Sequence, residues 1–226
     1  MTNERKMSLR KRPSSAILTA IVLLGGIVFT STGHAATFDH EHHQWTALLS
    51  KHVIAQQAHS NVQYSKLKRH HSDVKRYLES LRALSFNEFS SFSVEERLAF
   101  LLNTYNAFTV DLVLQHYPLT SLKELEKTGP SAWERPLFEL FGKARSLNQI
   151  ENEMIRLWFN EPRIHFALNC AARGCPRLLN QAYVASRLEQ QLAEATKNFL
   201  SDTARNRYQA KGGILELSTL FKWYSG

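Results

Sequence analysis

One stretch of this chain constrains its fold more than any other. Residues 93–117, SVEERLAFLLNTYNAFTVDLVLQHY, place apolar side chains on nearly every side of a helix, so we expect this helix to lie at the centre of the fold. Ser93-Val-Glu-Glu96 predicts its start, because an N-cap serine and a glutamate three residues later bind each other's backbone N–H groups. Pro118 predicts its end, because proline cannot continue a helix.

Two asparagines interrupt this apolar helix. Asn103 and Asn106 are three residues apart and share one face. A buried carboxamide without partners costs about 1–3 kcal/mol, so both side chains should meet polar groups. In one interpretation they bind the backbone of a neighbouring loop. In the other they line a cleft, and Asn103, Tyr105 and Asn106 are ligand-binding residues.

The rest of the chain predicts an α+β fold, a predominantly helical single domain with a small β-sheet. Apolar periodicity predicts further helices over residues 45–58, 62–84, 147–159 and 182–200. Two more capping boxes, Ser121–Glu124 and Ser146–Gln149, mark additional helix starts.

Three segments suggest other structure. The short apolar run RIHFALNC, residues 163–170, predicts a buried strand. Gly212-Gly213 joins two extended runs within residues 206–218 and predicts a C-terminal hairpin. Residues 126–145 show no periodic spacing of apolar residues, which predicts a packed loop with a short hairpin.

Residues 1–35 have the pattern of a secretory signal peptide. A charged start is followed by AILTAIVLLGGIVF, fourteen residues without charge, and then by small residues that favour cleavage after Ala35 or Ala36. The apolar run is short for a membrane span, although an uncleaved N-terminal anchor is the alternative. We therefore expect an exported, periplasmic protein with no transmembrane segment after signal cleavage.

The charge balance favours weak binding to anionic surfaces rather than to nucleic acid. The net charge of +8 falls to about +4 without residues 1–35, which hold five bases and one acid. The cluster KLKRHH, residues 66–71, is either an anionic-surface contact or a solvated helix face. Residues 36–60 are expected to form an N-terminal tail and a first helix, with His40, His42 and His43 in the solvated tail rather than on a metal.

Both cysteines of the chain lie close together, which leaves three interpretations open. His165, Cys170 and Cys175 provide three metal ligands where structural zinc sites need four, so no metal is expected. A Cys170–Cys175 disulfide suits an exported chain, with Gly174 allowing the turn between them to close. A catalytic thiol is the third interpretation.

The catalytic interpretation makes Cys170 a nucleophile that needs an adjacent base. His165 is the candidate base, although in a strand it would face away from Cys170. The sequence thus gives Cys170, His165 and Glu151 as catalytic candidates, and Asn103, Tyr105, Asn106 and Arg173 as binding candidates. No cofactor is expected.

Several blocks of this chain resemble the family known as domain of unknown function 547 (DUF547), here as a bacterial exported member. They are ERLAFLLNTYNAFTVDLVLQHYPLTSLKEL, SLNQIENEMIR, PRIHFALNCAARGCPRL and LSTLFKWYSG. The resemblance implies a DUF547-like domain over residues 61–226, apparently truncated at its C-terminus. Asn152 stands where the family usually has histidine, so no general base is expected there.

The resemblance implies no reaction, because the activity of the family is not established. It implies that the cysteine clasp is optional, since some plant relatives have serine at the position of Cys175. Two hypotheses follow. The first is a binding or scaffold module whose cysteines clasp a loop, and the second is a thiol-dependent hydrolase or acyl transferase with Cys170 as nucleophile.

Overall fold

A computed structural model describes residues 37–56, 59–172 and 174–223, which fall within the unit Thr37–Gly226. The predicted signal peptide, residues 1–35, and the binding candidate Arg173 lie outside the described residues. In the part of the chain that is described, none of the helices combines the length and the apolar character that a bilayer crossing requires.

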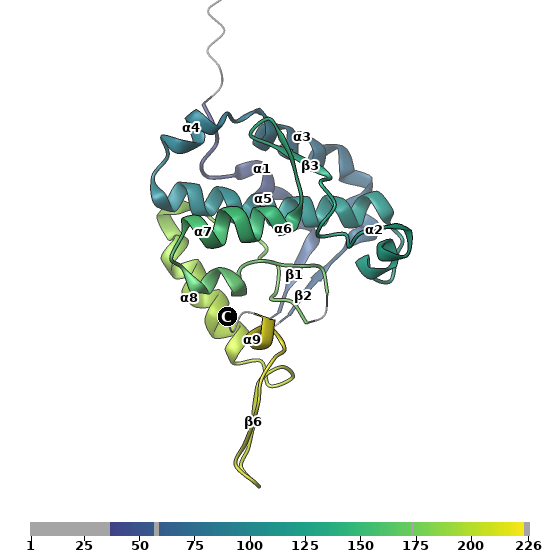
Figure 1. Cartoon of the computed structure of the whole chain (residues 1–226), viewed down its shortest axis with the longest axis vertical. Helices are drawn as coiled ribbons and strands as arrows, with labels where there is room; N and C mark the ends of the chain where they lie inside the picture. Colours follow the sequence, from purple (N-terminus) through teal and green to yellow (C-terminus); the bar gives the residue numbers. More distant parts are fainter. Residues whose placement is uncertain (1–36, 57–58, 173, 224–226) are drawn as a thin grey trace, which may run out of the picture. The chain divides into compact units, whose positions relative to one another are not determined.

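Helix α5, Val94–His116, forms the centre of this unit (Figure 1). Its capping box is present: Glu96 N donates to Ser93 Oγ over 3.1 Å, and Ser93 N donates to the Glu96 carboxylate over 2.8 Å. Every residue from Leu98 to Leu114 is buried. The prediction of a central helix is therefore confirmed.

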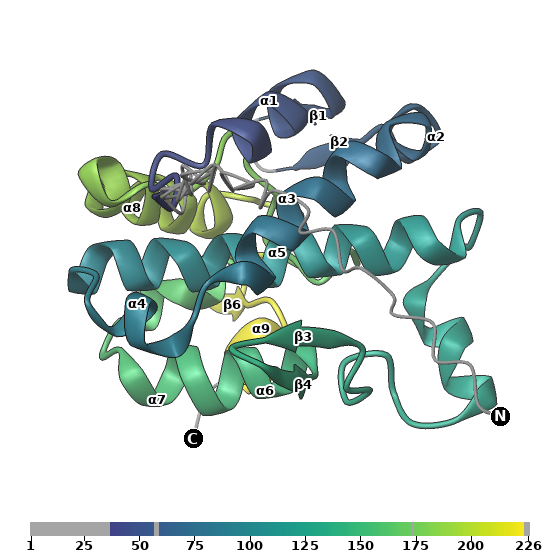
Figure 2. The same cartoon turned by 90° about the horizontal axis from the view of Figure 1, so that it is seen from above.

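The first layer of helices lies on one side of α5, where α3 packs against α5 and α1 packs against α3 (Figure 2). It comprises α1 (His43–His52), α2 (Tyr64–Leu67), the 3-10 turn η1 (Lys68–His70) and α3 (His71–Ala83). The next helix, α4 (Phe86–Ser90), instead contacts Phe141 and Trp158 through its Phe86 and Phe89 rings. Helix α1 ends earlier than predicted, because the chain turns at Val53 into strand β1 (Val53–Ala55), which pairs with β2 (Ser60–Val62).

A second group of elements lies across α5 from α1 (Figure 2). It contains the predicted short hairpin, β3 (Phe138–Leu140) with β4 (Lys143–Arg145), and a continuous helical run of α6 (Leu147–Gln149), the π-helix η3 (Ile150–Ile155) and α7 (Arg156–Trp158). The capping boxes at Ser146 and at Ser121, which begins the 3-10 helix η2 (Leu122–Thr128), are both present.

The C-terminal part contains η5 (Ala185–Arg187), helix α8 (Leu188–Leu200), the hairpin of β5 (Arg207–Gln209) and β6 (Ile214–Glu216), and α9 (Leu220–Trp223). The predicted hairpin is confirmed, and it extends away from the helices (Figure 1). The fold is a predominantly helical α+β domain, as predicted. Within the described residues, the predicted small sheet is three separate antiparallel pairs, β1–β2, β3–β4 and β5–β6.

The prediction of a buried strand at residues 163–170 is wrong. The segment begins with the 3-10 helix η4, Pro162–Phe166. Proline occupies the first turn, where its missing N–H is harmless, and the Glu161 carboxylate accepts a 3.0 Å hydrogen bond from Arg163 N. The proline and the Glu161 cap favour a 3-10 helix more strongly than the apolar run favours a strand.

The segment from Thr37 to His42 also differs from the solvated tail that we expected. The Phe38 ring lies 5.8 Å from the Phe92 ring, and His42 is only 2% exposed. Aromatic and imidazole groups therefore fasten the segment to the helices.

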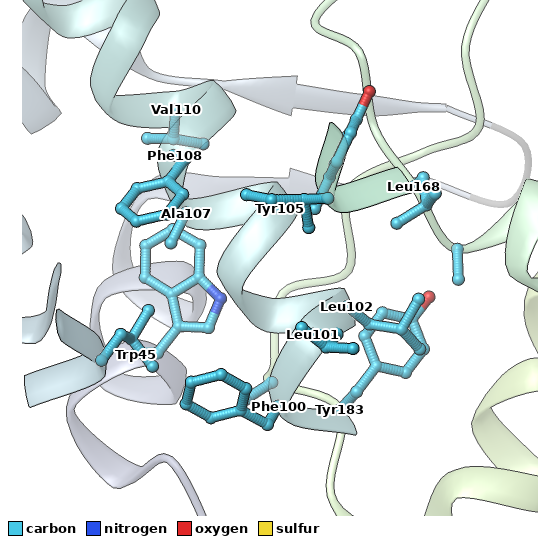
Figure 3. Close-up of a cluster of buried hydrophobic side chains, with 14 of the residues drawn as sticks. Trp45, Phe100, Leu101, Leu102, Tyr105, Ala107, Phe108, Val110, Leu168 and Tyr183 are labelled. Atoms are coloured by element: carbon cyan, nitrogen blue, oxygen red, sulfur yellow. The ribbon is translucent and has the colours of Figure 1, made fainter. Parts of the chain in front are cut away.

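Two later loops reach the core around α5. Tyr183 lies beside Leu102 of the helix and Leu168 lies farther along the same side (Figure 3), and all three are buried. These loops bring the cysteine segment and the segment before α8 onto the face of α5 that carries the asparagines.

Candidate functional site

Asn106 holds the backbone that leads into the cysteine segment. Its Nδ2 donates to the carbonyl oxygen of Ala167 over 3.0 Å, and its Oδ1 accepts from the backbone N–H of Asn169 over 2.8 Å. The carboxamide thus pairs with the loop as a neighbouring peptide group would in a β-ladder.

Asn103 binds a second loop in the same way. Its Nδ2 donates to Tyr183 O over 2.7 Å, and Tyr183 N donates back to its Oδ1 over 2.9 Å. Both asparagines therefore fit the first sequence interpretation, in which they bind the backbone of neighbouring loops. Tyr105 is 2% exposed and lies with the core side chains of Figure 3.

Asn169 extends this arrangement to both ends of the cysteine loop. Its Nδ2 donates to Pro176 O over 2.7 Å, and its Oδ1 accepts from Ala171 N over 3.0 Å. The sequence analysis missed this positioning residue. The available signal was an asparagine directly before Cys170 in a mostly apolar run.

Cys170 and Cys175 form a disulfide, which confirms the predicted clasp. Cys175 is 3% exposed, whereas Cys170 is half-buried. Between them, Ala171 has a left-handed backbone, at φ 55°. Such a conformation costs about 1–2 kcal/mol for a residue with a side chain, and the bond from Ala171 N to Asn169 helps to hold it.

A groove lies between strand β2 and this loop. Its larger part, about 320 Å³, is lined by polar groups and the disulfide: His59, Ser60, Asn169, Cys175, Arg177 and Arg205. An adjoining hollow of about 240 Å³ is lined by β2 and shares Ser60, Asn169 and Ala172 with the first. The wall opposite β2 is therefore the loop that the disulfide and Asn169 hold.

Neighbouring groups fix Arg177 and Arg205, which belong to the described lining of the groove. Arg177 donates to Gln56 O and to Glu194 Oε1, each over 2.9 Å. Arg205 binds the buried carboxylate of Asp202 and donates to Cys175 O over 3.1 Å. Because both of these guanidinium groups are paired, they give the described groove rigid polar walls.

The other catalytic candidates lie elsewhere. His165 lines a separate apolar hollow of about 180 Å³ with Phe166 and Phe221. Burial there, and then the charge of Arg156, lower the pKa of His165 to about 4. Glu151 is 8% exposed on the π-helix η3, which packs against α5. Among the described side chains, neither of these two lines the groove.

The described groove presents hydrogen-bonding groups that neighbouring residues hold in place. The Cys170 sulfur is bonded to Cys175, so in this state neither cysteine has a free thiol. No three His, Cys, Asp or Glu side chains within residues 37–56, 59–172 and 174–223 are grouped so that they could hold a metal ion.

Comparisons with known proteins give one match. The model of the family described as "Protein of unknown function, DUF547" matches residues 89–200, whereas neither the curated proteins nor the solved structures gave a match. The match is narrower than the resemblance noted above, since LSTLFKWYSG lies beyond it. It includes the whole asparagine-held cysteine loop, so residues 89–200 are similar to the DUF547 family.

Proposed function

We propose that the protein is a binding module whose groove, between β2 and the cysteine loop, holds an extended polar ligand of the peptide class. The observation that carries the proposal is the double fixation of one groove wall. The Cys170–Cys175 bond and the hydrogen bonds of Asn169 hold the same loop. Because this wall is already ordered, less conformational entropy is lost when a ligand binds to it.

The peptide class is favoured by the opposite wall. Strand β2 pairs only with β1 among the described strands, so its other edge carries unpaired main-chain groups. Extended peptides bind such edges through main-chain hydrogen bonds, with side-chain pockets giving specificity. Ser60 and Asn61 of β2 line the groove.

We further propose that the protein is exported to the periplasm. The signal-peptide pattern of residues 1–35 supports this, and so does the disulfide, because such bonds persist in oxidising compartments. Cell fractionation with N-terminal mass analysis tests it. Export predicts a mature chain that begins near Thr37 in the periplasmic fraction, and an uncleaved cytoplasmic chain contradicts it.

The competing proposal is a thiol-dependent hydrolase or acyl transferase with Cys170 as nucleophile. It requires a reduced Cys170, so the disulfide supports the binding module instead. Alkylation of the exported protein without reductant separates the two. The binding module predicts no labelling, whereas one thiol that reacts faster than free cysteine near neutral pH favours the enzyme.

A groove-filling variant tests peptide binding. Ala172 is exposed and lines both parts of the groove, so Ala172→Trp should fill it. On an array of short peptides, the wild type should select a subset, and the variant should bind these peptides about tenfold more weakly or worse. Ala193→Trp, on the exposed face of α8, is the matched control and should bind as the wild type does. Equal binding by the Ala172 variant, or no peptide selected by the wild type, contradicts the proposal.

A further inference from the structure

A second cavity, separate from the groove, is lined by residues of α1, η1 and α3. Its volume is about 330 Å³. Most of its lining is polar, with Gln44, Lys51 and His52 from α1, His70 from η1, and Asp73 and Arg76 from α3. Neither the fold nor the proposed peptide groove explains this set of side chains.

His52 is the unusual member of the set. It is 3% exposed, and neither of its ring nitrogens has a hydrogen-bond partner in the described structure. Its ring lies near that of His70, with the centroids 5.1 Å apart. Buried polar atoms in native proteins are nearly always paired, so an unpaired imidazole that lines a cavity indicates a ligand.

The charges around His52 indicate the sign of that ligand. Lys51 and Arg76 line the cavity, and the charges of Lys66 and Arg69 also act on the imidazole, against the single carboxylate of Asp73. Burial is the largest cause that lowers the pKa of His52, followed by the charges of His70, Lys51, Lys66 and Arg69. A neutral imidazole still donates one N–H to an anion.

A metal cation does not fit these surroundings. Lys51 Nζ lies 3.5 Å from His70 Nε2, so an ammonium group occupies the position that a cation would need to reach that nitrogen. Asp73 already pairs with Arg76 over 3.1 Å. Histidines beside Lys and Arg side chains instead match the way proteins bind phosphate oxygens.

We propose that the cavity between α1 and α3 binds a phosphate group, with the His52 imidazole donating a hydrogen bond to a phosphate oxygen and Lys51 and Arg76 supplying opposite charge. The shared chemistry is a phosphate that is either free, part of a small ester, or part of a lipid headgroup. The site is independent of the peptide groove, so either proposal can fail without the other.

Titration with inorganic phosphate tests the site. The mature protein is followed by the NMR signals of its histidine rings at constant ionic strength, with sodium chloride as the comparison salt. We expect saturable binding that shifts the His52 ring. His52→Phe should weaken binding about tenfold or more, the usual effect of losing a hydrogen bond to a charged group.

A second variant keeps the test decisive if His52→Phe fails to fold. Lys51 is exposed, so Lys51→Gln should fold normally and weaken phosphate binding about fivefold. Lys123→Gln, on an exposed turn outside the cavity, is the matched control and should change the affinity less than twofold. The absence of saturable binding, or equal affinity in wild type and His52→Phe, overturns the proposal.

Vesicles identify the source of the phosphate. Phosphatidylcholine vesicles with and without phosphatidylglycerol are sedimented with the protein. Sedimentation only with phosphatidylglycerol, reversed by inorganic phosphate and lost in His52→Phe, supports the site with a lipid headgroup as its ligand. Binding of inorganic phosphate without sedimentation supports it with a soluble phosphate compound.

Discussion

The two ends of helix α1 carry two buried histidines with opposite surroundings. His42 precedes the helix and is 2% exposed, and its Nδ1 shares a 2.7 Å hydrogen bond with Tyr77 Oη, whose ring stacks on Trp45. His52 ends the helix and is 3% exposed, but its ring has no hydrogen-bond partner among the described residues. Equal burial therefore does not imply an equal role.

The basic cluster of residues 66–71 is divided between the core and the cavity. Lys68 donates to the carbonyl oxygen of Leu114 near the end of α5, and His71 lies 2.6 Å from the buried Asp111 carboxylate of that helix. His70 instead lines the cavity beside His52. Lys68 and His71 therefore hold elements of the fold together, whereas the unpaired ring of His52 marks a candidate site.

The largest effect is expected where a paired group is removed from the core. Asn106→Leu leaves Asn169 N–H and Ala167 C=O buried without their partner. We expect the free energy of unfolding in urea to fall by about 4 kcal/mol, since each orphaned group costs about 1–3 kcal/mol.

The exposed Asn160 provides the control for this substitution, and Asn160→Leu should stay within about 0.5 kcal/mol of the wild type. A loss below about 1 kcal/mol in Asn106→Leu would mean that the asparagine does not hold the loop.

The second effect concerns pH and the paired histidine. Burial lowers the pKa of His42 to about 4, whereas the unfolded chain keeps the ordinary value of 6.5. Between these values the unfolded chain binds a proton that the folded protein does not, so stability is lost as pH falls from 6.5 to 4. The loss from this one group should reach about 3 kcal/mol at pH 4.

Urea unfolding between pH 7 and pH 4 measures this loss. His42→Asn suits the left-handed backbone, at φ 48°, and removes the titrating ring, so its stability should depend less on pH. The exposed His116 is the control, and His116→Asn should keep the wild-type pH dependence. An unchanged pH dependence in His42→Asn would show that His42 is not kept neutral by burial.

The disulfide should contribute less than the asparagine. Closing a loop of six residues stabilises a protein by about 2 kcal/mol in the chain-entropy estimate, and the double variant Cys170→Ala/Cys175→Ala should lose this amount. Because the bonds from Asn169 to Ala171 and Pro176 remain, the loop should keep its backbone path. Wild-type protein in reductant should match the double variant, and unchanged stability in both would argue against the clasp.

The sequence predicted those features that depend on neighbouring residues. The three capping boxes, the Gly212-Gly213 hairpin and the apolar central helix each follow from short patterns, and each is present. The strand prediction for residues 163–170 failed because an apolar run of eight residues fits a strand or a buried helical turn equally well. Pro162 and Glu161, just outside that run, decided the outcome.

The candidate site depended on contacts that no short pattern specifies. The sequence showed that Asn103 and Asn106 needed polar partners, but those partners lie 61 to 80 residues away. The disulfide was predicted because only two cysteines exist, whereas the groove needs β2, which lies more than 100 residues before the loop. The unpaired state of His52 depends on the side chains of another helix.

The smallest effect is expected at the unpaired histidine, and it separates the two ends of α1 most directly. His52→Phe removes two buried nitrogens that have no partners and keeps a ring of similar shape, so stability should stay the same or rise by about 1 kcal/mol. His42→Phe removes the partner of the buried Tyr77 hydroxyl and should lower stability by about 2 kcal/mol. Urea unfolding of both variants in phosphate-free buffer measures the contrast. Equal losses of unfolding free energy in the two variants would show that His52 has a structural partner. His52 would then hold the fold as His42 does, and it would no longer mark a binding cavity.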